Sequence, residues 1–227
     1  HKSQISKTDG QAFINSMASL SAEFANSLGE GSVTGGEIST TTSSLNSMFA
    51  SQSAGFEQVI NNNFSENVAP YLISICSALT NPESNMNTSA TISNIKAVEA
   101  TIISDVSLTT KEKSLLLRSA SIARFSTVYW ADKMTNSNSD WSNWASVCDL
   151  DNETEALPLI STGVAVGVGA VVDVVEYAYT DDQGHKWYES LGYAINGSGL
   201  AAFTVLTAGA GDVIGALAGA IGSALNW

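Results

Sequence analysis

The few side chains that could carry out chemistry lie mostly in the last third of the sequence. His185 is the only histidine apart from His1, so an internal catalytic arrangement that needs an imidazole must use it. Asp181 and Glu189 lie four residues before and after His185, and on one helix this spacing would place three metal-binding or acid–base groups on one face. The residues around Gly184, however, are typical of a turn. We therefore favour an arrangement in which Asp181 lies outside the helix and His185 lies near its start.

A second candidate is the acidic run over residues 149–155, in which aspartate or glutamate occupies every other position. Alternating acids resemble the start of a calcium-binding loop. The glycine that such a loop requires is replaced by Thr154, and its terminal glutamate is replaced by Ile160. These carboxylates could hydrolyse a glycosidic bond only if the fold placed two of them on opposite sides of a sugar. We interpret the run as a solvated segment.

No recognised catalytic motif completes either candidate. The sequence contains no G-x-S-x-G elbow, no Walker loop, no H-E-x-x-H pair and no dinucleotide fingerprint. Its two cysteines form neither a C-x-x-C pair nor a cluster with histidines, which excludes the usual zinc spacings. We therefore predict no catalytic residue, no cofactor and no metal, and we expect that the protein is not an enzyme.

The two cysteines, Cys76 and Cys148, are predicted to form a disulfide. An even pair in a lysine-poor chain rich in serine, threonine and asparagine fits an oxidising compartment. A bridge between them would close a long loop and stabilise the fold by about 3 to 5 kcal/mol. The alternative is two separate buried thiols, because cysteine also packs as a small hydrophobic residue.

The charge of the chain excludes one class of partner. Nine basic residues against 22 acidic residues leave a formal net charge of -13, and no basic residue occurs between Lys7 and Lys96. Nucleic acid is an unfavourable partner, because its phosphates are bound by clustered cations. Five of the nine cations fall in one predicted helix, where we expect them to neutralise acidic neighbours. These cations are Lys111, Lys113, Arg118, Arg124 and Lys133.

The composition and the start of the chain indicate an exported protein. The sequence begins at His1 without methionine and shows no signal peptide, so we expect an export signal that has been removed. Only 14% of the residues are charged, against roughly 25% in an ordinary soluble domain. The predicted location is extracellular, periplasmic or on the cell surface.

Apolar residues recur at steps of three and four in several segments, which predicts a series of amphipathic helices. Such segments cover residues 9–28, 45–60, 65–79 and 92–102. Thr109 and Glu112 form a capping box, which marks the start of a further helix. Its apolar surface is wide enough to indicate burial on more than one side, with Phe125 and Tyr129 close beside the main face. The main face consists of Leu116, Ala120, Ala123, Thr127 and Trp130.

Glycine dominates the C-terminal third. The stretch from Pro158 to Val172 is uncharged and fits a helix or a strand, of which we favour the helix because the pattern continues to Tyr179. Glycine costs roughly 1 kcal/mol inside a helix, so glycines at every fourth position suggest close approach of another helix backbone. The predicted packing glycines are Gly163, Gly167, Gly211, Gly215, Gly219 and Gly222.

The predicted fold is therefore all-α. We expect one domain over residues 1–227, a helical bundle in which residues 1–157 form amphipathic helices and residues 158–227 form glycine-rich apolar helices packed on them. The C-terminal part would contain a helical hairpin between Pro158 and Gly211. The alternative is an α fold with a small β-hairpin near residues 172–190. No segment fits a permanent membrane span, which needs roughly 20 apolar residues.

This glycine pattern resembles the glycine-zipper segments of bacterial envelope proteins and of some secreted antibacterial peptides. The layout, including the segment from Arg118 to Trp130 and the last 70 residues or so, is similar to that of small exported or lipid-anchored proteins of gut bacteria. The resemblance implies an envelope location and supplies no catalytic residue. At the level of layout, a helical domain with an apolar hairpin near its C-terminus also resembles the pore-forming domains of colicins.

Two functional interpretations follow. The first is a non-enzymatic exported or cell-envelope protein with a structural or interaction role, which associates with itself or with an envelope partner. The alternative is a pore-forming or bacteriocin-like toxin, whose concealed apolar hairpin inserts into a membrane under certain conditions.

Overall fold

The structure is a computed structural model that describes residues 7–29, 31–41, 56–80, 87–135 and 157–207. These residues form helices joined by short turns, and none of them is in a strand. The all-α prediction is confirmed, and the alternative β-hairpin near residues 172–190 is wrong. The helices are α1 (Lys7–Ser27), a short helix over residues 35–41, α3 (Phe56–Asn63), α4 (Ala69–Thr80), α6 (Thr88–Ser104), α7 (Thr110–Thr135), α9 (Leu157–Asp182) and α10 (Trp187–Thr207).

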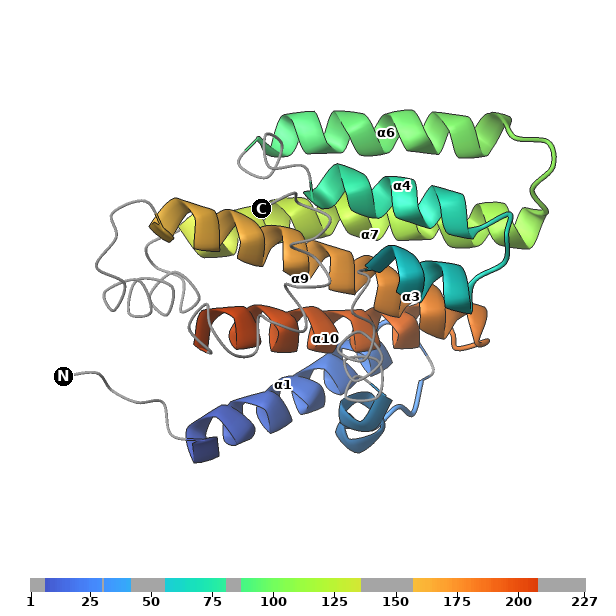
Figure 1. Cartoon of the computed structure of the whole chain (residues 1–227). Coiled ribbons are helices and arrows are strands. Elements are labelled where there is room, and N and C mark those ends of the chain that lie inside the picture. Colours follow the sequence, from blue (N-terminus) through green and yellow to red (C-terminus); the bar gives the residue numbers. More distant parts are fainter. Residues whose placement is uncertain (1–6, 30, 42–55, 81–86, 136–156, 208–227) are drawn as a thin grey trace.

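The hairpin formed by α9 and α10 lies in the middle of the bundle (Figure 1). Helices α7 and α4 pack against α9, and α6 packs on α7 and α4 on the side away from the hairpin. Helix α1 packs against α10 on the opposite side (Figure 1). The hairpin is thus covered by α4 and α7 along one helix and by α1 along the other.

Helix α9 is apolar on all sides, which suits its central position. Every residue over 170–178 is buried, and most of them are alanine or valine. Such a helix is favoured where neighbours surround it, because each face then removes apolar surface from water. The alternation that also fitted a strand is therefore part of a longer helical pattern.

Helix α9 ends in a Schellman motif, which is followed by the turn into α10. Gly184 has a φ of 95°, a conformation that favours glycine. The amide of His185 donates to the carbonyl of Thr180 at 3.1 Å, and the amide of Gly184 donates to the carbonyl of Asp181 at 3.1 Å. The helix thus continues through Asp181 and Asp182, which sequence analysis assigned to the turn.

The predicted start and main face of α7 are confirmed. The amide of Thr109 donates to Glu112 Oε2 at 2.8 Å, and the amide of Glu112 donates to Thr109 Oγ1 at 3.2 Å. All five residues of the predicted face are buried. Beside this face, Leu115 is buried, whereas Phe125 and Tyr129 are exposed, so the prediction of burial on more than one side is wrong at Phe125 and Tyr129.

The described residues have two apolar cores. The larger core joins α3, α4, α6, α7 and α9 and contains bulky side chains such as Phe56, Leu72 and Trp130. The smaller core lies where α1 meets α10 and the short helix over residues 35–41. Its members are Ala18, Ala22, Ala25, Val33, Ile38 and Tyr193.

Helix α1 packs through its small residues. A Cβ added to Gly192 of α10 would lie 2.8 Å from Ala25 Cβ and 3.1 Å from the carbonyl oxygen of Ser21. The two helix backbones therefore approach closely, and only small side chains fit between them. Leu20 and Phe24 of α1, and Leu28 directly after it, are consequently left on the outer side.

Candidate functional site

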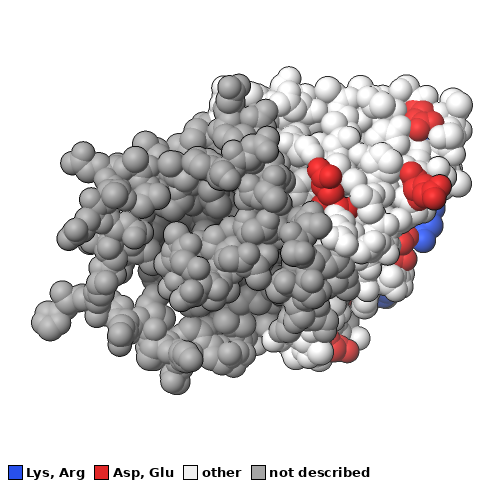
Figure 2. Space-filling model, in the orientation of Figure 1, with Lys and Arg blue, Asp and Glu red and all other residues white. Residues whose placement is uncertain are grey.

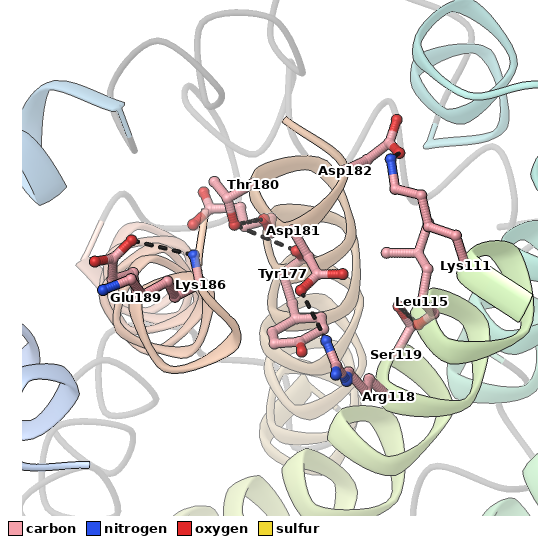
Figure 3. A network of polar contacts seen from close by, with 11 residues as sticks. Lys111, Leu115, Arg118, Ser119, Tyr177, Thr180, Asp181, Asp182, Lys186 and Glu189 are labelled. Atoms are coloured by element: carbon pink, nitrogen blue, oxygen red, sulfur yellow. Dashed lines mark hydrogen bonds and ion pairs between the residues drawn. The ribbon is translucent and has the colours of Figure 1, made fainter. Parts of the chain in front are cut away.

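The structure does not bring Asp181, His185 and Glu189 together. Asp181 is in the last turn of α9 and pairs with Arg118 of α7, with Nη1 and Oδ1 3.3 Å apart. His185 lies in the turn before α10, and its Nδ1 is 3.7 Å from Glu189 Oε2. Glu189 also accepts a hydrogen bond from the amide of Lys186 at 3.1 Å, which caps the start of α10 (Figure 3). The arrangement is a helix connection held by local contacts.

The expected neutralisation by the α7 cations is found around this connection. Arg118 and Lys111 reach from α7 toward Asp181 and Asp182 (Figure 3), and Lys111 Nζ lies 3.2 Å from Asp182 Oδ1. Partial burial raises the pKa of Asp181, although Arg118 opposes that rise. Burial also raises the pKa of Tyr177 to about 12. These two ion pairs connect the C-terminal end of α9 to α7.

Several other predicted residues cannot be placed. The acidic run over residues 149–155, Cys148, Gly211, Gly215, Gly219 and Gly222 all lie outside the described residues. Cys76 is a free, fully buried thiol on α4, and burial raises its pKa far above the usual range. The predicted Cys76–Cys148 disulfide is therefore not supported by the structure, and Cys76 matches the alternative of a buried thiol.

Two of the predicted packing glycines lie in a described helix, and their packing stays a prediction. Gly163 and Gly167 lie in α9, where Gly167 is buried. An added Cβ would overlap Tyr188 at Gly29 and Gly31. Within α9 and α10, tight contacts occur at Gly192, described above, and at three further glycines, where an added Cβ would overlap a side chain of a neighbouring helix. These are Gly169 against Trp130, Gly197 against Glu176 and Gly199 against Met17.

A pair of buried carboxyl groups lies in the middle of α9. Asp173 is 7% exposed and Glu176 is fully buried, although both follow an uncharged stretch of the helix. Asp173 accepts hydrogen bonds from the hydroxyl of Ser126 and from Trp130 Nε1, the latter at 3.2 Å. Burial raises the pKa of Asp173 to about 7, and hydrogen bonds from Ser126, Ser198 and Trp130 oppose that rise.

Glu176 has no such partners. Neither of its carboxyl oxygens has a hydrogen-bond partner among the described residues, and the carboxyl group lies against Gly197 of α10. Burial raises the pKa of Glu176 well above the usual range, and the neighbouring Asp173 adds to the rise. A buried carboxyl without partners is most stable in its neutral form.

The outer face of α1 is the second feature with functional potential. Leu20, Phe24 and Leu28 follow one another at four-residue steps and are 60%, 44% and 40% exposed. They belong to the apolar series predicted over residues 9–28, but in the structure they face away from the described core. We refer to these three side chains as the α1 stripe.

The surroundings of the α1 stripe are acidic. Glu23 is exposed on α1, directly before Phe24. Glu37 is exposed on the short helix and lies toward His185 and Tyr193, and Thr34 holds its carboxylate through hydrogen bonds that lower its pKa. No lysine or arginine occurs from residue 8 to residue 95. On the face drawn in Figure 2, acidic groups are spread over the described surface, whereas basic groups gather toward one edge.

The sequence does contain a signal for the burial of Asp173 and Glu176, although periodicity alone does not reveal it. Both acids lie among valines that occupy every side of the helix, so a fully buried α9 must also bury Asp173 and Glu176. The orientation of α1 has a weaker signal, the alanines at positions 18, 22 and 25 on the side opposite its bulky stripe.

The described residues contain no group of three or more histidine, cysteine, aspartate or glutamate side chains that could hold a metal ion. Within the same part of the chain, no helix combines the length and the apolar character that a membrane crossing requires. No protein-family model, no curated protein and no solved structure matches the sequence.

Proposed function

We propose that this chain is a non-enzymatic protein of the exported or cell-envelope class that mediates an interaction, and that the α1 stripe binds a basic amphipathic helix. The observation that carries the proposal is the orientation of α1, which buries alanines and exposes Leu20, Phe24 and Leu28. Apolar side chains at four-residue steps on an exposed helix match the contact pattern of a second helix. Covering each of them would contribute up to about 1.5 to 3 kcal/mol.

Charge argues for a basic partner over a second copy of the chain. Two copies of the α1 stripe would bring the acidic surroundings of each stripe together, and each copy carries a net charge of -13. A partner helix with lysine or arginine beside its apolar face would instead meet Glu23 favourably. The same charges would speed association at low salt.

The test uses two synthetic peptides and fluorescence anisotropy. One peptide presents leucines on one helical face and lysines on the other, and the second has the same composition in scrambled order without an apolar face. We expect the chain to bind the amphipathic peptide about tenfold or more tightly than the scrambled one. The triple variant Leu20→Ser, Phe24→Ser, Leu28→Ser should bind both peptides equally.

The control is the double variant Val106→Ser, Phe125→Ser, which removes exposed apolar residues from the α6–α7 side of the bundle. It should retain the wild-type preference for the amphipathic peptide. Equal loss of preference in the control and in the triple variant would refute a site on α1. Sedimentation could also show that the wild type is a dimer and that the triple variant is not. That result would mean that the α1 stripe binds a second copy of the chain and not a basic partner.

One observation favours a second function, that of a pore-forming toxin. The α9–α10 hairpin lies between α1 on one side and α4 with α7 on the other, which is the concealed position that such a mechanism needs. Release of an encapsulated dye from anionic liposomes, measured from neutral pH down to about pH 4, tests it. Strong release at acid pH supports the toxin, and no release at any pH refutes it.

A further inference from the structure

The carboxyl pair of α9 has no role in the proposed interaction, yet it occupies a costly position. Asp173 and Glu176 lie three residues apart, on the part of α9 that both α7 and α10 cover. Burying a carboxylate without compensation is so unfavourable that the group normally takes up a proton instead. The contacts of the two carboxyl groups show which helix contacts would change when the proton is gained or lost.

Asp173 connects α9 to both neighbours. Ser126 and Trp130 of α7 donate hydrogen bonds to one of its oxygens, and Ser198 of α10 also contributes a hydrogen bond to its carboxyl group. These donors stabilise a charged Asp173 in part. They do so only while the three helices remain packed together.

Glu176 lies directly at the contact between α9 and α10. Its carboxyl group occupies the space that a side chain at residue 197 would fill, so Gly197 is the residue that admits it. On the same stretch of α10, the side chain of Asn196 is also buried, and its amide has no partner among the described residues. A charged Glu176 would therefore be buried between α9 and α10 without a hydrogen-bond donor for its carboxylate in the described part of the chain.

In the described helices that pack on α9, no ion pair joins a cation to the pair. Arg118 and Arg124 of α7 are engaged with Asp181 and Glu99, and α10 contains no lysine or arginine. The three lysines of α7 also have other partners: Lys111 pairs with Asp182, Lys113 donates to the carbonyl of Ile103, and Lys133 pairs with Asp132. Helix α4 carries no charged residue. The charge on Asp173 also helps to raise the pKa of the Tyr129 phenol on α7. The other titratable groups on α4, α9 and α10 are Tyr71, Cys76, Tyr177, Tyr179, Asp181, Asp182, Tyr188, Glu189 and Tyr193.

We propose that Asp173 and Glu176 form a proton-binding site that controls how firmly α10 packs on α9. Protons from the solvent occupy the pair in the folded protein, and the carboxyl groups then fit the apolar contact. Loss of the proton from Glu176 leaves a carboxylate against Gly197. The α9–α10 contact then loosens, because hydration stabilises the charged carboxylate. The site thus makes the centre of the bundle tighter in acid and looser in alkali.

The sign of the pH dependence follows from the direction of the pKa shifts. Both carboxyl groups have a higher pKa in the folded protein than in the unfolded chain. The folded state therefore binds more protons, and stability falls as the pH rises from about 4, near the ordinary pKa, through about 7, where Asp173 ionises. The loss continues above that point until Glu176 ionises as well.

The first experiment compares urea unfolding midpoints of Glu176→Gln with those of the matched control Glu23→Gln, which changes an exposed glutamate of α1. Glutamine has nearly the same shape as the protonated acid but cannot ionise. We expect Glu176→Gln to raise the midpoint at about pH 8 and to leave it nearly unchanged at about pH 4. The control should follow the wild type at both pH values. Parallel wild-type and Glu176→Gln profiles would overturn the proposal.

The second experiment counts protons directly, so it does not depend on how glutamine packs. The unbuffered wild-type protein, unfolded by urea at about pH 6, should release about one proton more than Glu176→Gln does. Asp173→Asn should also release fewer protons than the wild type. If Glu176→Gln does not fold, the same measurement is made with Asp173→Asn. Equal proton release from the wild type and both variants would show that the pair is ionised in the folded protein and would contradict the site.

Discussion

The two sides of the central hairpin are packed in opposite ways. Where α9 meets α7, the contact is built from bulky side chains, and Trp130 lies against Gly169 and donates a hydrogen bond to Asp173. Where α10 meets α1, alanines and a glycine bring the backbones close together. The first contact surrounds a large aromatic ring and buries polar groups, whereas the second leaves Leu20, Phe24 and Leu28 of the α1 stripe exposed. The difference explains why the α7 side supplies hydrogen-bond donors to Asp173, whereas the α1 side can present a binding surface.

The largest expected effect is on the α7–α9 side. Trp130→Ala removes a large buried side chain together with a hydrogen-bond donor to Asp173. We expect the free energy of unfolding to fall by about 3 to 5 kcal/mol, as for other buried aromatic residues replaced by alanine. Urea denaturation followed by circular dichroism measures this loss.

Phe125→Ala is the matched control, because it removes an exposed aromatic residue from the same helix. Its loss should stay within about 0.5 kcal/mol. A small effect of Trp130→Ala, similar to that of the control, would contradict a bulky core between α7 and α9.

A smaller but clear effect is expected on the α1–α10 side. Gly192→Val places two methyl groups where Ala25 Cβ and the carbonyl oxygen of Ser21 leave no room. The helices must separate, which should cost about 1 to 3 kcal/mol. Gly36→Val is the control, because a Cβ there would meet only Thr34 Oγ1 at 3.9 Å. Similar melting temperatures for the two variants would argue against close backbone approach.

Much of the α7–α9 side could be predicted from the sequence. The capping box fixed the start of α7, and the spacing of Leu116, Ala120 and Trp130 identified its buried face. The helical state of α9 also followed from the length of its apolar pattern. These features depend on local hydrogen bonds and on periodicity, which a sequence displays directly.

The α1–α10 side could not be predicted in the same way. Periodicity shows that Leu20, Phe24 and Leu28 share one face, but it does not show which face the fold covers. That choice depends on glycine positions in α10, a helix more than 150 residues further along the chain. The contact of Gly197 with Glu176 could not be predicted either, because it depends on the register of the hairpin.

The orientation of α1 is the claim on which the proposed interaction depends, and neighbouring substitutions in this helix test it. Phe24 is on the α1 stripe and Ala25 is fully buried in the contact with α10. We expect Phe24→Ser to leave the urea midpoint nearly unchanged, whereas Ala25→Leu should lower the free energy of unfolding by about 1 to 3 kcal/mol. A large loss for Phe24→Ser with little loss for Ala25→Leu would mean that the bulky face of α1 is the buried one, and would refute the proposed binding surface.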